Sequence, residues 1–154
     1  MEVQQRSPKV AAGLSFAALS MLYSVMLVGV YISSSHQGLS CPDWPLCPNG
    51  FDLPSERHFF EHYHRVMVVI AAGLIYATAA YSFWNARPAR KTAIIAAIVV
   101  SVQIVFGMLV VTLRLEPLLV ATHLSTGILL FATTLMTFLT SYMLARKRRE
   151  STTL

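Results

Sequence analysis

Charge is scarce in this 154-residue chain. Asp, Glu, Lys and Arg together make up 12% of it, whereas 55% of the residues are hydrophobic. A typical soluble domain has about a quarter charged residues, which it needs to cover its surface. The composition therefore argues against a water-soluble enzyme and indicates a membrane protein. Low-complexity segments and a separate soluble domain are also missing.

Most of the sequence consists of long apolar segments. Four of them reach the roughly 20 residues that cross a hydrocarbon core: 10–32, 58–83, 92–113 and 118–145. The first has no early cleavage site after it and is longer than the apolar core of a signal peptide, so we expect it to span the membrane. The sequence predicts an all-α membrane protein, a single four-transmembrane-helix bundle over residues 1–154.

Basic residues gather on one side of the predicted membrane. They precede the first run, fill the connection between the second and third, and follow the fourth. By the positive-inside rule, both termini are cytoplasmic and the long loop 33–57 is external, in a multi-pass protein of the cell membrane. This topology explains the net charge of +5, so we expect contact with membrane lipid and no nucleic-acid binding. The residues are Arg6, Lys9, Arg87, Arg90, Lys91, Arg146, Lys147, Arg148 and Arg149.

The chain has two cysteines, Cys41 and Cys47, both in the external loop within GLSCPDWPLC. An oxidising compartment favours a disulfide between them. The alternatives are a metal site or free thiols, but the spacing is wider than zinc ligands usually show and there is no second pair. Sequence alone does not separate a structural disulfide from a redox-active one.

Two histidines lie at matching depth in the second and fourth predicted helices. His64 and His123 are each five or six residues inside the outer end, about 8–9 Å at 1.5 Å per residue. Neutral imidazole is the usual protein ligand of haem iron, so the pair predicts a haem site. The alternative is that each ring only hydrogen-bonds a neighbour. A weak internal echo adds Gly29 and Gly107, one on each preceding helix.

Three polar residues accompany the histidines. Glu61 lies one turn before His64, and an ionisable residue within a membrane span suggests function. The plainer interpretation is an ion pair with Arg65, which could also meet a haem propionate. Gln103 is expected to hydrogen-bond across the bundle or to lie beside a ligand.

Small residues of the third and fourth helices are expected to serve packing. Gly107 would let a neighbouring helix or a flat macrocycle approach closely, and packing is the simpler explanation. Ser125 and Thr126 are interpreted as ordinary packing residues in the fourth helix.

Several stretches together resemble the heme A synthase family, membrane enzymes of cytochrome oxidase assembly. They are Gly38–Cys47, the E-x-x-H-R motif of Glu61, His64 and Arg65, QIVFGMLV from Gln103 to Val110, and LVATHL from Leu119 to Leu124. They follow the family's order over most of the chain. The loop combined with E-x-x-H-R is a specific combination.

The resemblance implies oxidation of a ring methyl of heme O to a formyl group, giving heme A for terminal oxidases. It implies His64 and His123 as ligands of haem iron, with haem b as a resident cofactor. Arg65 and Gln103 would help bind the haem. Glu61 would be the catalytic carboxylate beside the reacting haem. Because typical members have eight helices in two similar halves, we expect a homodimer or higher homo-oligomer.

Two other classes of function stay open. One is a non-catalytic membrane cytochrome b that transfers electrons. The other is a haem-free oxidase assembly subunit that docks through its cysteine loop. An electron-transfer partner and a heme O synthase are the further partners that the resemblance suggests.

Overall fold

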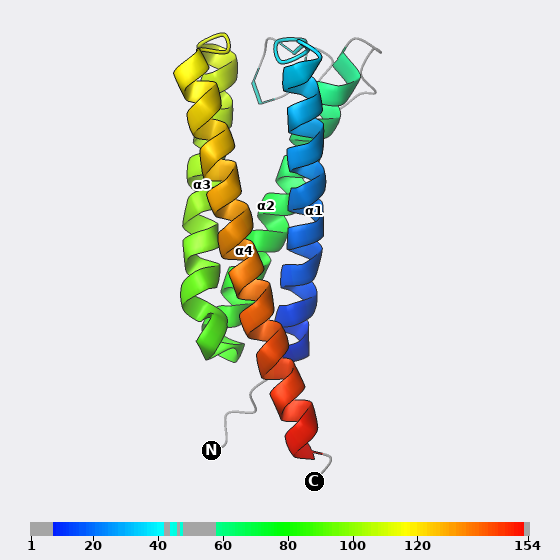
Figure 1. The fold of residues 1–154 in the computed structure, drawn as a ribbon, viewed down its shortest axis with the longest axis vertical. Helices are drawn as coiled ribbons and strands as arrows, with labels where there is room; N and C mark the ends of the chain where they lie inside the picture. The colour runs from blue at the N-terminus through cyan, green and yellow to red at the C-terminus, as the bar shows by residue number, and fades with distance from the viewer. Residues whose placement is uncertain (1–7, 42–43, 46, 48–57, 153–154) are drawn as a thin grey trace.

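The computed structural model describes residues 8–41, 44–45, 47 and 58–152 of the chain. Four of its helices are long and apolar enough to cross a membrane, which confirms the predicted all-α, four-helix membrane bundle. Parts of the predicted loop 33–57 lie outside the described residues. The helices are α1 (Pro8–Ser34), α2 (Phe59–Asn85), the short 3-10 helix η2 (Arg87–Ala89), α3 (Arg90–Thr112) and α4 (Pro117–Thr152) (Figure 1).

The short turn between α3 and α4 is fixed by local chemistry. Arg114 and Leu115 adopt positive φ angles of 54° and 63°, which reverse the chain. Glu116 then caps α4, since its Oε2 accepts the N–H of Leu119 at 2.9 Å. Pro117 opens the helix at the position where its missing N–H costs nothing. This turn makes α3 and α4 antiparallel neighbours.

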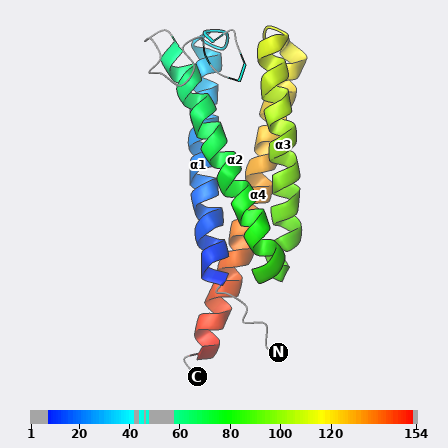
Figure 2. The same ribbon diagram turned by 180° about the vertical axis from the view of Figure 1, so that it is seen from behind.

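Helix α4 extends well past the predicted end at residue 145. Its 36 residues would measure about 54 Å, against roughly 30 Å for a hydrocarbon core. The prediction ended the span at the basic cluster, but Arg and Lys are good helix formers and nothing there breaks the helix. An Arg146–Glu150 contact of 3.0 Å supports the extra turns. Figures 1 and 2 show this end projecting beyond the other helices.

The four helices form a ring in which each packs against the next: α1 on α2, α2 on α3, α3 on α4, and α4 back on α1. Helices α2 and α4 are therefore diagonal to each other. We call α1 and α2 the first hairpin, and α3 and α4 the second hairpin. The start of α1 and the end of α4 lie at one end of the bundle, and the cysteine loop lies at the other (Figures 1 and 2).

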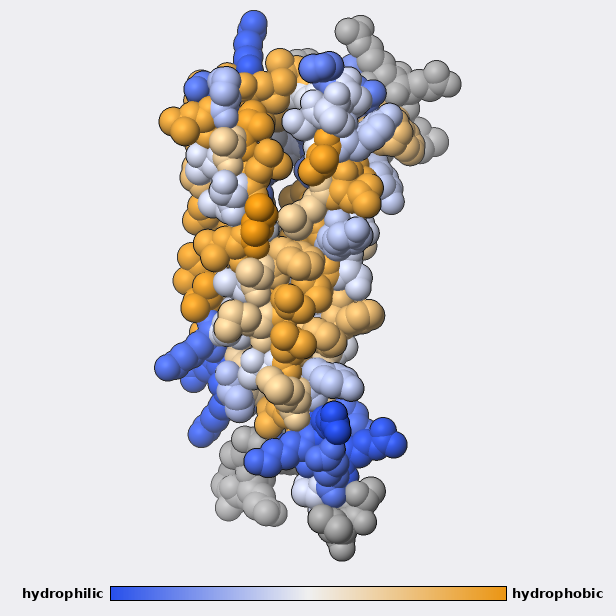
Figure 3. All heavy atoms as spheres, viewed as in Figure 1, coloured by the Kyte–Doolittle hydropathy of each residue, from blue (hydrophilic) through white to orange (hydrophobic). Residues whose placement is uncertain are grey.

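The shared core lies in the half away from the cysteine loop. Small side chains such as Ala18, Ala72 and Ala96 are buried there and let the helices approach closely. On α3, the buried residues end at Val100, about halfway along the helix. Nearer the cysteine loop the hairpins diverge, and Figure 3 shows the surface hollowed between α4 and α1. We call this space the cleft.

The hairpins meet again at the loop end of the cleft. Gly38, in the cysteine loop, lies against Leu115 in the turn between α3 and α4. A β-carbon at position 38 would be only 3.1 Å from Cδ2 of Leu115. The cleft is therefore bounded by the packed core at one end and by this loop contact at the other.

Candidate functional site

The structure places His64 and His123 at the same end of the bundle, on its two diagonal helices. His64 is the sixth residue of α2 and His123 the seventh of α4. Both side chains are half-buried. Diagonal helices in a four-helix ring face each other across its centre. The two imidazoles therefore come from opposite hairpins, on helices that lie diagonally across the ring.

Each histidine ring lies against a glycine of the other helix in its hairpin. Cε1 of His64 would be 3.0 Å from a β-carbon built on Gly29 of α1. Cε1 of His123 would be 3.4 Å from one built on Gly107 of α3. The weak sequence echo of two glycines and two histidines is therefore a repeated contact. The close approach of a neighbouring helix predicted at Gly107 is confirmed, because the His123 ring that lies there belongs to α4.

The donor set fits a haem. Nδ1 of His64 and Nδ1 of His123 are buried and have no hydrogen-bond partner among the described residues. A buried polar atom without a partner calls for a ligand or some other explanation. Within those residues no group of three or more His, Cys, Asp and Glu side chains is placed to hold a bare metal ion. Haem iron needs only axial ligands from the protein, because the porphyrin supplies the other four nitrogens.

Glu61 is buried and both of its carboxylate oxygens are occupied. Oε2 accepts the hydroxyl of Ser40 and the backbone N–H of Cys41, each at 2.8 Å. Oε1 accepts Nη2 of Arg65 at 2.7 Å, one helical turn away. The side chain is 6% exposed, so these charge-assisted bonds offset the cost of burying a carboxylate. The plainer sequence interpretation, the Glu61–Arg65 pair, is present.

Arg65 ties α2 to the cysteine loop. Its Nη2 also donates to the carbonyl oxygen of Cys41 at 2.9 Å, and Nη1 donates to that of Pro45 at 3.3 Å. The guanidinium of Arg65 is thus directed at loop carbonyls and at Glu61. Together, Glu61 and Arg65 form what we call the loop latch. The Glu61–Arg65 pair was predicted from the sequence, but its contacts with the loop were not, because these partners lie some twenty residues earlier in an irregular segment.

A disulfide joins Cys41 and Cys47, as predicted, with their Cα atoms 5.0 Å apart. Both residues are buried. Since Cys41 gives its N–H to Glu61 and its carbonyl oxygen to Arg65, the latch grips the disulfide loop at one of its cysteines. The loop, the latch and His64 therefore form one connected unit at the end of the first hairpin.

Gln103 supports His123 from the neighbouring helix. Its Nε2 donates to the carbonyl oxygen of His123 at 2.9 Å and lies 3.4 Å from the ring Nε2. Its Oε1 accepts the hydroxyl of Thr126. Gly127 makes room, because a β-carbon there would lie 3.2 Å from Nε2 of Gln103. The hydrogen bond across the bundle expected for Gln103 is present, whereas Thr126, interpreted as a packing residue, belongs to this network.

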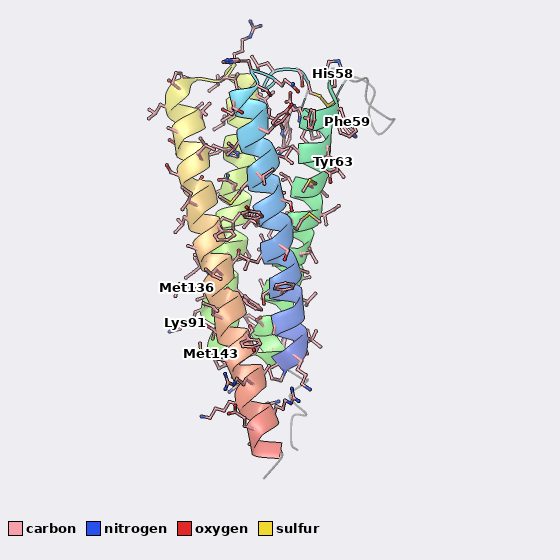
Figure 4. All side chains as sticks on the ribbon, turned by 45° about the vertical axis from the view of Figure 1, so that its right-hand side comes forward. His58, Phe59, Tyr63, Lys91, Met136 and Met143 are labelled. Atoms are coloured by element: carbon pink, nitrogen blue, oxygen red, sulfur yellow. A yellow bond between two sulfur atoms is a disulfide. The ribbon has the colours of Figure 1, made fainter. Side chains whose placement is uncertain are left out.

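The side chains labelled in Figure 4 lie near the two ends of the bundle. Phe59 and Tyr63 are on the outside, at the cysteine-loop end of α2, and His58 precedes them with its Nδ1 buried and without a hydrogen-bond partner among the described residues. The rings of Phe59 and Tyr63 stack on each other at 6.0 Å. Met136 and Met143 are exposed near the opposite end. These two methionines therefore lie at the end of the bundle away from His64 and His123.

Comparison with known proteins identifies the family. A family model described as "Cytochrome oxidase assembly protein" matches residues 54–154. A protein named heme A synthase from Lysinibacillus sphaericus is 34% identical over 104 residues, which are 61% of this chain and 33% of the relative. Another of that name, from Shewanella oneidensis, is 27% identical over 134 residues, 75% of this chain and 41% of the relative. The chain thus spans well under half the length of these relatives. The matched stretch includes Glu61, His64, Gln103 and His123, and the chain belongs to the heme A synthase family of cytochrome oxidase assembly proteins.

Proposed function

We propose that this chain oxidises the ring methyl of heme O to the formyl group of heme A. The observation that carries the proposal is the placement of His64 and His123 at the same end of the bundle, on its two diagonal helices. Each ring has a buried nitrogen without a hydrogen-bond partner in the described part of the chain. Family membership supplies the substrate class, and the two relatives carry the name heme A synthase.

His64 and His123 would hold the iron of a bound haem, either resident haem b or the substrate heme O. A haem supplies iron-centred redox chemistry that protein side chains lack. If both histidines bind the iron, no iron position would be left for oxygen. His64 and His123 would then hold the macrocycle in the cleft, which would suit oxidation at a peripheral methyl or transfer of electrons.

Glu61 is the carboxylate that we propose beside the reacting haem, one helical turn from His64. Oxidation of a methyl group releases protons, and a carboxylate can accept them. Three donors already occupy the two carboxylate oxygens of Glu61. These contacts favour an electrostatic role over proton uptake, because a proton on either oxygen would displace a donor. Arg65, with its positive charge, would attract a haem propionate while it holds the loop.

The cysteine loop would close the external side of the cleft, in the orientation that the basic residues predict. Gly38 and the latched Cys41 place this loop across the end of the space between the hairpins. A loop in that position can exclude water from a bound haem and limit its exit. The Cys41–Cys47 disulfide would keep the loop short while Glu61 and Arg65 hold it to α2.

Pigment analysis tests the proposed reaction. The full chain is expressed in a membrane together with a source of heme O, and the haem is extracted and separated from the purified protein. We expect a formyl haem from the wild type and none from a His64→Ala, His123→Ala double variant. If only protohaem is recovered from wild type over a range of oxygen supply, the reaction is wrong.

A membrane cytochrome b is the second candidate function. The pairing of His64 with His123 favours it, because two histidine ligands would leave no iron position free, as is usual for electron-transfer haems. This protein would bind protohaem, would be reduced and reoxidised by a donor and an acceptor, and would yield no formyl haem in the same experiment. The pigment therefore separates the two functions.

A further inference from the structure

The two glycine–histidine contacts occupy equivalent places in the two hairpins. Gly29 lies five residues before the last residue of α1, and Gly107 lies five residues before the last residue of α3. The histidine each one meets is close to the start of the following long helix, at its sixth or seventh residue. The same arrangement of glycine, helix end and histidine thus occurs twice around the cleft.

The spacing between glycine and ring is tight at Gly29 and is an ordinary van der Waals contact at Gly107. A β-carbon at position 29 would lie 3.0 Å from Cε1, 3.6 Å from Nδ1 and 3.9 Å from Nε2 of His64. It would therefore contact the end of the ring that carries both nitrogens. At position 107 the nearest atom would be Cε1 of His123 at 3.4 Å. A methyl group at position 29 would push the ring by a few tenths of an ångström, whereas one at position 107 would just touch it.

Glycine by itself is common in membrane helices, so the contact and not the residue type carries the argument. Gly13 of α1 and Gly73 of α2 are glycines without such a contact. A β-carbon at either position would meet nothing within 4 Å. Two glycines in the same hairpin therefore border open space, while Gly29 and Gly107 border a histidine ring.

We propose that Gly29 and Gly107 are positioning residues that seat the two imidazoles for a metal porphyrin. Each leaves out a β-carbon so that the histidine ring of the neighbouring helix lies against its backbone in one orientation. The orientation of the two ring planes then follows from the helix backbones, which are the most rigid part of each hairpin. This inference rests on the proposed haem site, and its test separates the two.

The test uses valine and alanine at four glycines. Gly29→Ala and Gly107→Ala add a single methyl group against a histidine ring, and Gly29→Val and Gly107→Val add a larger side chain there. Gly13→Ala and Gly73→Ala are matched controls in open space. Circular dichroism of each purified protein checks that the helices are retained. Two measurements then follow, one with haem and one without.

With haem, we measure haem per protein and the electron paramagnetic resonance (EPR) spectrum of the oxidised form. The principal g values of a low-spin haem depend on the angle between its two imidazole planes. We expect both valine variants to lose haem affinity by about tenfold, as when a neighbour that orients a ligand is removed. Gly29→Ala should shift the largest g value more than Gly107→Ala, and the controls should match wild type.

Without haem, we record the Cε1–H resonances of isotope-labelled histidine in detergent. The His64 resonance should shift in Gly29→Ala, the His123 resonance should shift in Gly107→Ala, and neither should shift in the two controls. If Gly29→Ala and Gly107→Ala fold and both resonances are unchanged, these glycines do not position the histidine rings, and this inference is wrong even if haem binds. If the resonances shift but wild type takes up no haem, Gly29 and Gly107 do contact the histidine rings. The proposed porphyrin ligand and the proposed function are then both wrong.

Discussion

Each hairpin presents one histidine, but the residues around the two histidines differ. Each brings a histidine to the cleft against a glycine of its partner helix. One turn before that glycine, the first hairpin has Val25 and the second has Gln103. Three residues after the histidine, the corresponding pair is Met67 and Thr126. Val25 and Met67 pack together as buried apolar side chains, whereas Gln103 and Thr126 hydrogen-bond.

On the side of the histidines nearer the cysteine loop, the first hairpin has polar residues and the second has apolar ones. Glu61 lies three residues before His64 and Arg65 follows it, and this pair grips the cysteine loop. In the second hairpin the equivalent positions are the apolar Val120 and Leu124. Glu61 and Arg65 thus hold the loop on the outer side of His64, whereas the amide of Gln103 holds the backbone of His123. The same helix frame supports a different environment at each histidine.

Removing either histidine should have the largest effect, and an equal one in the two hairpins. His64→Ala and His123→Ala each take away one axial ligand, and we expect haem per purified protein to fall to near background. His62→Ala, on the same helix as His64 but pointing elsewhere, serves as the control. If one of the two ligand variants keeps full haem content, the hairpins are not equivalent ligand donors.

Breaking the loop latch should affect the first hairpin alone. In Glu61→Gln an amide N–H₂ must face either Arg65 or the donors on Oε2, so a buried charge loses its partner. We expect a loss of stability of about 3 kcal/mol, measured by denaturation in detergent. The Cys41–Cys47 disulfide should also be reduced faster by an added dithiol.

Glu150→Gln is a matched control for the latch. Glu150 pairs with Arg146 at the same four-residue spacing, but the two side chains are 63% and 70% exposed, so little change is expected. Heme A yield should fall in Glu61→Gln. A folded Glu61→Gln protein with its haem and with unchanged heme A yield would show that Glu61 has no role in the reaction.

Removing the amide of Gln103 should have the smallest effect and should be confined to the second hairpin. Gln103→Met keeps the volume but loses the bonds to His123 and Thr126, at a cost of about 1 kcal/mol. Haem should stay bound, and the resonance of the His123 ring should shift while that of His64 does not. Ser101→Ala removes another contact of α3, the 2.9 Å bond to Tyr76, and should move neither ring.

Much of the frame could be predicted from the sequence because it depends on local patterns. Apolar runs define the spans, and His64 and His123 follow from depth along helices whose rise per residue is fixed. The ring of helices, and hence the diagonal placement of α2 and α4, needed the structure. Short connections identify α3 and α4 as neighbours but say nothing of how α1 meets α4.

The contacts that hold Glu61 and the two histidines in place could not be predicted, since they join residues that are distant in the sequence. Ser40 and Cys41 reach Glu61 only through the path of an irregular loop. Thr126 has a sequence signal in its spacing of three residues from His123, but its bond to Gln103 depends on how α3 and α4 are rotated. The contact of Gly29 with His64 needs a precise approach of two helices, which a glycine in an apolar run does not reveal.

The central claim is that one imidazole from each hairpin binds the same iron. EPR of the oxidised, purified wild-type protein tests this most directly. We predict a low-spin signal with the g values of two imidazole ligands, converted to high spin in whatever haem the single histidine variants retain. A high-spin wild-type spectrum, or a low-spin spectrum that survives the loss of either histidine, would contradict it.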